Sequence, residues 1–212
     1  MKIDDPIADA LLGDSTYERV RAERWGWFKQ PIPKKLAWQS YLLFALAAVL
    51  PLTAALPAGV RESPLSDVAS TSPKIALLAM VAAVLVAATG LGHAGVGLRR
   101  FSLEPSLTEV QALELFNLES LCSLVGFLTG GFATLVTYVF LLVGFGGVEA
   151  LETYVAAGGG NPFATSTLGV DVASVAVFAM VGAVVLRLLS TYLYVESLRL
   201  ELGLVATGTE SA

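Results

Sequence analysis

One uncharged stretch, residues 120–145, most constrains how this chain can fold. It contains no Asp, Glu, Lys or Arg, and it is longer than the roughly 20 apolar residues that a helix needs to cross a bilayer core about 30 Å thick. As a helix it carries small and polar residues on one face, at steps of three and four, and large apolar residues on the other. The apolar face suits lipid and the small face suits another helix, so the stretch predicts a membrane-embedded helical bundle.

Three further apolar blocks complete the predicted bundle. The chain is 55% hydrophobic and 15% charged, whereas a soluble domain carries about 25% charged residues. We predict an all-α membrane protein whose four-helix transmembrane domain covers residues 36–204. Its third and fourth helices extend into the cytoplasm, and a flexible tail follows at 205–212. The predicted spans are 36–56, 75–98, 121–145 and 172–194.

Several local signals mark where these helices begin, bend and end. Pro51 lies inside the first span and predicts a kink, because proline lacks the N–H that a helix interior needs. Ser106 with Glu109 predicts a capping box at the start of the third helix, and Gly130-Gly131 is a second point where that helix can bend. Residues 148–157 predict a short surface helix.

The first 35 residues form an N-terminal arm. Ser15 and Glu18 predict a capping box for a helix that runs to about Lys29. This helix carries basic residues beside Trp and Phe, which favours an interfacial amphipathic helix at the level of the lipid headgroups. The alternative is a soluble arm folded on the cytoplasmic face.

The distribution of Lys and Arg predicts the orientation of the bundle. Seven of them precede residue 36, and Arg99 with Arg100 follow the second span, whereas the two remaining loops hold only Arg61 and Lys74. Cytoplasmic loops carry the excess of Lys and Arg. We therefore predict a multi-pass cell-membrane protein with both termini in the cytoplasm.

Polar residues at similar depth in the inner half of the membrane form a candidate polar cluster. Arg187 lies on the small face of the fourth helix, and a charge at this depth should pair or reach toward the interface. We predict that Arg187 pairs with Glu119 in a structural salt bridge; the alternative is that Arg187 contacts a substrate or an ion. His93, the only histidine, can relay protons or simply bond a neighbouring helix. The predicted cluster consists of Arg187, Glu119, His93, Gln39, Tyr41, Ser123 and Ser190.

Small residues predict where the helices pack closely. They recur at steps of three and four on the second, third and fourth helices, which lets neighbouring backbones approach one another. Cys122 is expected to be a buried packing residue. The predicted packing positions are Gly90, Gly126, Gly130, Ala83 and Ala183.

The composition excludes several chemistries. One His and one Cys in 212 residues cannot supply a bis-histidine haem or a three-histidine zinc site, and no cofactor or metal is expected. No Lys lies inside a predicted span, which argues against a retinal Schiff base, and no Asp does, which argues against an aspartyl intramembrane protease. The net charge of −5 offers no basic field for nucleic acid. Enzymes are thus disfavoured, although a lipid-modifying site built from Glu and Arg stays open.

Two functions remain. The first is a structural or accessory membrane subunit that packs against itself or a partner, so that its partners are the lipid bilayer and a homo-oligomer or larger membrane complex. The second is a small channel or transporter, formed as an oligomer with a cytoplasm-facing polar cavity. Few lysines, many acidic residues and abundant Ala and Val make the composition similar to that of proteins from salt-loving archaea.

Overall fold

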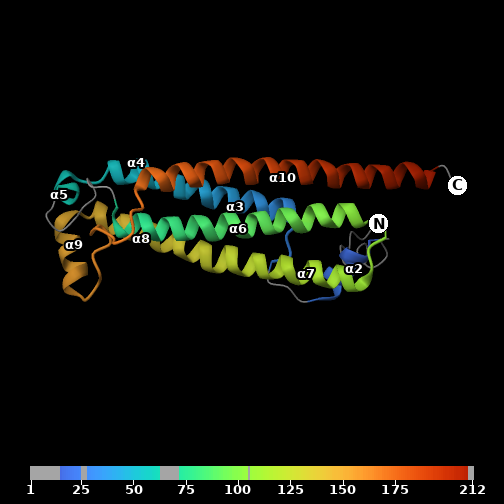
Figure 1. Cartoon of the computed structure of the whole chain (residues 1–212), viewed down its shortest axis with the longest axis horizontal. Helices are drawn as coiled ribbons and strands as arrows, with labels where there is room; N and C mark the ends of the chain where they lie inside the picture. Colours follow the sequence, from blue (N-terminus) through green and yellow to red (C-terminus); the bar gives the residue numbers. More distant parts are fainter. Residues whose placement is uncertain (1–14, 25–27, 63–71, 105, 210–212) are drawn as a thin grey trace, which may run out of the picture.

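The computed structural model describes residues 15–24, 28–62, 72–104 and 106–209. This part of the chain is helical and has no strand (Figure 1). Its elements are α2 (Thr16–Glu23), α3 (Ile32–Ala47), α4 (Val49–Ala54), α5 (Ala58–Arg61), α6 (Lys74–Leu103), α7 (Glu109–Ser123), the π-helix η1 (Leu124–Gly130), α8 (Gly131–Phe145), α9 (Gly147–Ala156) and α10 (Val172–Thr209).

Four helical segments are long and apolar enough to cross a membrane, which confirms the predicted number of spans. The first begins at Ile32, earlier than predicted. Pro31 is extended and caps α3, and Pro33 lies in its first turn, where the missing N–H of proline removes no helical hydrogen bond. Lys35 therefore lies inside the span and not before it. The four segments are Ile32–Ala54, Lys74–Leu103, Glu109–Phe145 and Val172–Arg199.

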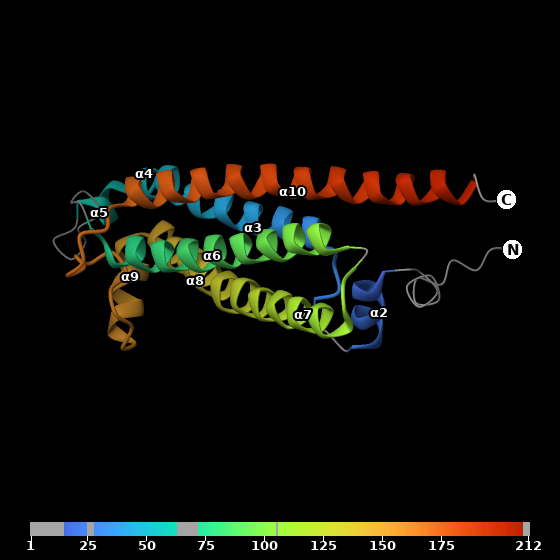
Figure 2. The ribbon, with the colours of Figure 1, turned by 45° about the vertical axis from the view of Figure 1, so that its right-hand side comes forward.

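The four segments lie side by side along the long axis of the molecule (Figures 1 and 2). Helix α6 packs against α3, against α10 and against all three parts of the third segment. Helix α10 lies on one side of the bundle and α7 on the other, with α3 and α6 between them (Figure 2). We call the end that holds α2 the arm end, and the end that holds α5 and α9 the loop end.

Small residues fill the contacts between these helices, as predicted. Ala83 and Ala183 are fully buried. A side chain on Gly90 would overlap Leu186 of α10, and one on Gly130 would lie 2.7 Å from Cγ2 of Val86 on α6. The large apolar residues of the third segment face outward, where lipid suits them. They include Leu121, Leu128, Phe132, Leu135, Val139 and Leu142.

Pro51 interrupts the first segment where its chemistry requires. Helix α3 ends at Ala47 and α4 begins at Val49. Proline at 51 cannot donate to the carbonyl four residues earlier, that of Ala47, so the break falls one turn before the proline. The structure thus shows an interruption of the helix at Ala48, where a kink or an irregular last turn is predicted.

The third segment differs from the prediction in how it starts and where it becomes irregular. Its capping box is formed by Thr108 and Gln111, whereas the Ser106 hydroxyl donates to the carbonyl of Leu103 at 2.9 Å; the predicted box at Ser106 and Glu109 is wrong because the helix starts later. Gly130 and Gly131 both have ordinary helical dihedral angles. The irregular stretch is instead the π-helix η1, which precedes Gly131.

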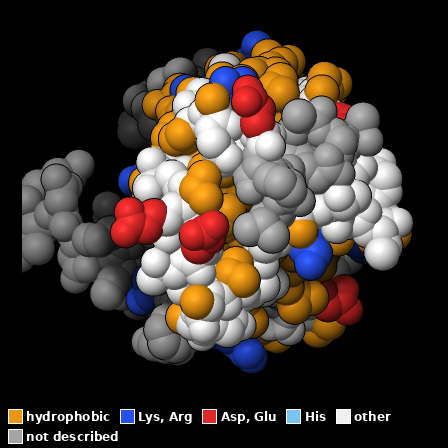
Figure 3. Space-filling view, turned by 90° about the vertical axis from the view of Figure 1, so that its left-hand side faces the viewer, with side chains coloured by type: hydrophobic (Ala, Val, Ile, Leu, Met, Phe, Trp, Pro, Cys, Tyr) orange, Lys and Arg blue, Asp and Glu red, His pale blue; other side chains and the backbone are white. Residues whose placement is uncertain are grey.

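The loop end is closed where the start of α6 meets the segment that joins α9 to α10. Two N–H groups at the start of α6 donate to carbonyls of that segment. Lys74 donates to Ala164 at 2.9 Å, and Ile75 donates to Pro162 at 2.8 Å. Buried Phe163 lies against Gly144. Helix α9 confirms the predicted surface helix and crosses the bundle axis (Figure 1). Charged side chains are scattered over this end (Figure 3).

At the arm end two helices differ in length from the prediction. The N–H of Glu18 donates to Ser15 Oγ at 3.5 Å, so Ser15 is the N-cap of α2. The Glu18 carboxylate pairs with Arg100 instead, so only half of the predicted capping box is formed. The helix ends at Glu23 and not near Lys29; Trp25 and Trp27 lie outside the described residues. Helix α10 continues to Thr209, through most of the stretch that was predicted to be a flexible tail.

Candidate functional site

Seven polar side chains form one continuous hydrogen-bonded group inside the bundle, toward its arm end. They come from four elements that are distant in the sequence: α2, α3, α6 and α7. All are buried, none exposing more than 9% of its surface. We call this group the buried polar chain, and its members are Tyr17, Lys35, Gln39, Thr89, His93, Glu119 and Ser123.

The centre of the buried polar chain is an ion pair between Lys35 and Glu119. Lys35 Nζ lies 2.5 Å from Glu119 Oε1 and donates to Ser123 Oγ at 2.9 Å. Each partner is only 2% exposed. A charge removed from water to this extent is tolerated when it is both paired and hydrogen-bonded. The pair therefore joins α3 to α7, and separating the two helices would cost free energy because it would leave a buried charge unpaired.

Tyr17 attaches the arm to this ion pair. Helix α2 packs against α7, and the Tyr17 hydroxyl donates to Glu119 Oε2. Burial raises the pKa of Tyr17 above its usual range, and the negative charge of Glu119 raises it further. Tyr17 thus remains a neutral donor at any physiological pH, and Glu119 has a partner on each carboxylate oxygen.

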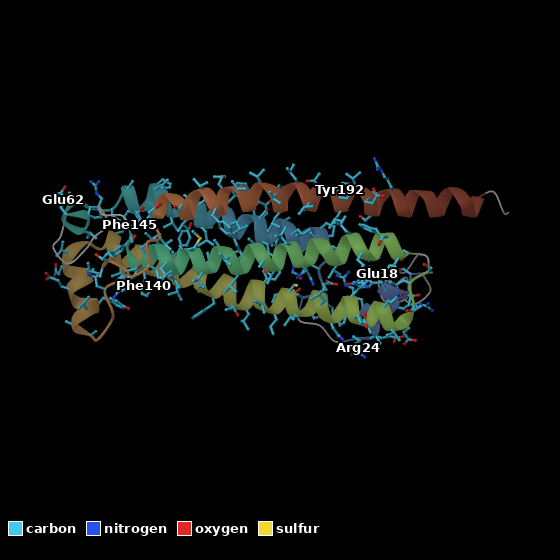
Figure 4. The ribbon with its side chains drawn as sticks, in the orientation of Figure 1. Glu18, Arg24, Glu62, Phe140, Phe145 and Tyr192 are labelled. Atoms are coloured by element: carbon cyan, nitrogen blue, oxygen red, sulfur yellow. The ribbon has the colours of Figure 1, made fainter. Side chains whose placement is uncertain are left out.

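Arg100 makes a second connection between the arm and the bundle. Its guanidinium lies 4.6 Å from the centre of the Tyr17 ring and 2.8 Å from Glu18 Oε1. Figure 4 labels Glu18 at the arm end, beside α7. Arg100 thus contacts both α2 residues from α6, and the arm is held by α6 as well as α7.

The other branch of the chain runs through His93. Gln39 Nε2 donates to Thr89 Oγ1 at 3.0 Å, and the Thr89 hydroxyl donates to the carbonyl of Leu85 at 2.7 Å. This fixes the amide of Gln39 so that Oε1 faces His93 Nδ1, 3.0 Å away. Nδ1 therefore carries a proton and donates to Gln39.

Ser123 can bond His93 in two ways. His93 Nε2 lies 3.0 Å from Ser123 Oγ, which also lies 2.8 Å from the carbonyl oxygen of Glu119. A neutral imidazole accepts the Ser123 proton, whereas a cationic one donates to Ser123, whose own proton then turns to the carbonyl. Because Lys35 also donates to Ser123, a proton can shift from Lys35 to His93 through this hydroxyl with no movement of heavy atoms.

The π-helix η1 lies directly beside the buried polar chain. Gly126 of η1 packs so closely that a Cβ atom there would lie 2.5 Å from Gln39 Nε2 and would also overlap Thr89. The next residue, Phe127, has its ring centre 6.5 Å from that of His93 and 5.2 Å from that of Phe28. An aromatic layer therefore covers the His93 side of the chain.

The structure brings together only part of the predicted polar cluster. Glu119, His93, Gln39 and Ser123 belong to the buried polar chain. Arg187 does not: its guanidinium lies over the ring of Tyr41, 5.4 Å from the centre, on the outer surface. The predicted pairing of Arg187 with Glu119 is wrong, because α3 and α6 lie between α10 and α7 (Figure 2).

Ser190 also lies apart from the chain. Its hydroxyl donates to the carbonyl of Pro33 at 2.7 Å and ties α10 to the start of α3. Pro33 is the second residue of α3, so its carbonyl lies near the point where the chain enters the bundle. Ser190 therefore has a packing role between two helices.

Sequence reasoning missed Lys35, Tyr17 and Thr89. The predicted first span begins at residue 36, which leaves Lys35 just outside it, but the helical segment begins at Ile32, so the premise that no lysine lies inside a span is wrong. The signal that could have found it is the pair Pro31 and Pro33, which places the helix start before Lys35. Tyr17 was hidden among basic residues of the arm, and nothing in its neighbours indicates that it faces inward.

Removal of the Tyr17 hydroxyl should loosen the arm. We expect Tyr17→Phe to lower the free energy of unfolding by about 1.5–3 kcal/mol, the range for a hydrogen bond to a charged group. Hydrogen exchange of α2 should accelerate in the same variant. Thermal unfolding in detergent and exchange mass spectrometry measure both effects. Tyr192→Phe is the control, because Tyr192 is exposed on α10; equal losses in both variants would contradict the role given to Tyr17.

Neither a metal centre nor a known relative identifies the site. In the described part of the chain, no three His, Cys, Asp or Glu side chains gather closely enough to hold a metal ion. No protein-family model, curated protein or solved structure matches this chain. The chemistry of the site must therefore be argued from its own residues.

Proposed function

We propose that this protein is a structural or accessory membrane subunit that acts through helix packing, against itself or against a partner. One observation supports the proposal: the polar side chains of the interior bond one another and are sealed from both solvent and lipid. Polar groups that line a pathway keep bonding capacity for a passing solute. Here that capacity is used to join α2, α3, α6 and α7.

The half of the bundle nearer the loop end supports the same proposal. Its polar side chains bond backbone carbonyls: Thr134 that of Gly130 at 2.8 Å, Thr137 that of Ala133 at 2.9 Å. Tyr138 donates to the carbonyl of Ala45 at 2.6 Å. None of these three continues the buried polar chain toward the loop end.

The second candidate function is a small channel or transporter formed by an oligomer. The relay from Lys35 through Ser123 to His93 favours it, since a hydroxyl between an amine and an imidazole can pass a proton. The proton would still need an exit on each side of the bundle, and Tyr17 covers the chain at the arm end.

A flux and mass measurement tests these two functions. We expect proteoliposomes under a pH gradient to leak protons no faster than empty vesicles. In mild detergent we expect a particle heavier than the 22.2 kDa chain, measured by light scattering. Proton flux that disappears in His93→Asn would favour the transporter, and a monomer with such flux would overturn the proposal.

We further propose that the arm end faces the cytoplasm, with the arm at the membrane surface. The excess of Lys and Arg at that end supports this orientation. An impermeant thiol reagent added to intact cells should label Glu152→Cys on α9 and miss Glu23→Cys on α2. Both positions are exposed acids, and the native Cys122 is buried. The reverse labelling pattern would mean that the bundle is inverted.

A further inference from the structure

Two exposed cations are each stacked on an aromatic ring of α3. Lys34 Nζ lies 5.7 Å from the ring centre of Trp38 on α3. Arg187 of α10 lies 5.4 Å from the ring centre of Tyr41, which is 55% exposed. Lys34, Trp38 and Tyr41 follow one another at steps of four and three, so they share one side of α3. We call these four residues the cationic face.

The two cations lie at nearly the same depth. The hydrogen bond from Ser190 to Pro33 aligns α10 with the start of α3. Arg187 precedes Ser190 by three residues, about 4.5 Å of helix, and Lys34 follows Pro33 by one, about 1.5 Å. The Cα atoms of both cations therefore lie within about one helical turn of the level where α3 begins, and their side chains reach farther along α3, that of Lys34 to Trp38 and that of Arg187 to Tyr41. Lipid headgroups meet the acyl chains near such a level, where Trp and Tyr also gather.

The surroundings of the cationic face are apolar and its charges are not neutralised by the protein. Leu188, next to Arg187, is 65% exposed, and Val184 and Phe44 are exposed as well. Among the described residues, neither Lys34 nor Arg187 has a carboxylate within salt-bridge distance. Cations bordered by lipid-facing apolar residues favour an anion from outside the chain.

We propose that the cationic face binds the phosphate of an anionic phospholipid in the leaflet at the arm end. Lys34 and Arg187 flank the phosphate, while Trp38 and Tyr41 pack beside the glycerol and the first acyl carbons. A second copy of the chain fits this face less well, because a symmetric contact through it would bring four cations together, and none of the four residues of the cationic face is an acid that could pair with them. An anionic lipid supplies the missing charge without that repulsion.

The test compares lipids with equal acyl chains. Delipidated protein in detergent is titrated with dioleoyl phosphatidylglycerol, with dioleoyl phosphatidylcholine and with inorganic phosphate, and bound lipid is counted by native mass spectrometry. We expect phosphatidylglycerol to bind more tightly than phosphatidylcholine, and inorganic phosphate to compete weakly. Arg187→Gln and Lys34→Gln should each weaken phosphatidylglycerol binding about fivefold, and the double variant about 25-fold. This fold-change corresponds to about 1 kcal/mol of electrostatic attraction for each Lys or Arg near anionic lipid.

Arg199→Gln is the matched control, because Arg199 is also exposed on α10 but pairs with Glu196 at 3.3 Å. It should bind phosphatidylglycerol as the unmodified protein does. All substituted side chains are exposed, so thermal stability should stay unchanged and report correct folding. Equal affinity for both lipids, or unchanged affinity in the double variant, would overturn the proposal. Tight competition by inorganic phosphate would identify a soluble anion, and loss of a dimer in Arg187→Gln would identify a second copy, each in place of lipid.

Discussion

Replacement of Lys35 by methionine should lower the free energy of unfolding by about 3–5 kcal/mol, because it leaves Glu119 charged and unpaired in the interior. The loss is expected to be large since the ion pair is almost completely buried. Methionine has a similar length and keeps the packing against α7, so the loss reports the charge and not a cavity. Thermal or denaturant unfolding in detergent measures the change.

A double-mutant cycle separates the pair from its parts. Glu119→Gln should also destabilise, because it leaves the Lys35 ammonium without its counter-charge, whereas Lys35→Met combined with Glu119→Gln should recover much of the loss. Arg199→Met is the control: it breaks an exposed pair with Glu196 and should change stability by less than about 1 kcal/mol. Additive losses at Lys35 and Glu119 would mean that the two side chains do not interact.

The coarse fold could be predicted because the bilayer core sets the length and the apolar composition that a crossing helix must have. An uncharged stretch of sufficient length is a candidate for a spanning helix, and residues 120–145 meet that condition. Steps of three and four then tell which side of each helix is small, and Gly126 and Gly130 do face neighbouring helices. Large residues such as Leu128 face outward for the same reason.

The order of the helices around the bundle could not be predicted from the same signals. A small face says that a helix packs closely but names no partner. Arg187 and Glu119 lie at compatible depths, yet α3 and α6 lie between their helices (Figure 2). The depth of a residue follows from counting residues along its own helix. The identity of the neighbouring helices depends on packing between helices, which the sequence of one helix does not determine.

Only part of the buried polar chain could be predicted from the sequence. Gln39, His93, Glu119 and Ser123 are polar residues in apolar segments, and such residues stand out. Lys35 did not, because a lysine next to a span is ordinarily a charge at the interface. Its interior position depends on two things: Pro31 fixes a helix start before Lys35, and Glu119 of α7 provides a buried carboxylate. Only the carboxylate stabilises the Lys35 charge in the interior.

Replacement of Gly126 by leucine should be the most damaging change at a residue with no polar side chain. A Cβ atom at Gly126 would lie 2.5 Å from Gln39 Nε2 and would overlap Thr89. Overpacking costs about 1–3 kcal/mol, and loss of the Gln39–Thr89 hydrogen bond adds about 1 kcal/mol. We expect the free energy of unfolding to fall by about 3 kcal/mol, measured by thermal unfolding in detergent.

Two control variants separate overpacking in the interior from a general effect of substitution in this helix. Leu128→Phe lies two residues away on the outward face, where Leu128 is 62% exposed, and should be nearly neutral. Gly131→Ala meets no atom within 4 Å and should stabilise slightly, since alanine favours helix by about 1 kcal/mol over glycine. If Gly126→Leu is tolerated as well as Leu128→Phe, then η1 does not pack against Gln39 and Thr89. The buried polar chain would then be accessible to solvent on that side. A transporter needs such access, whereas a structural subunit does not.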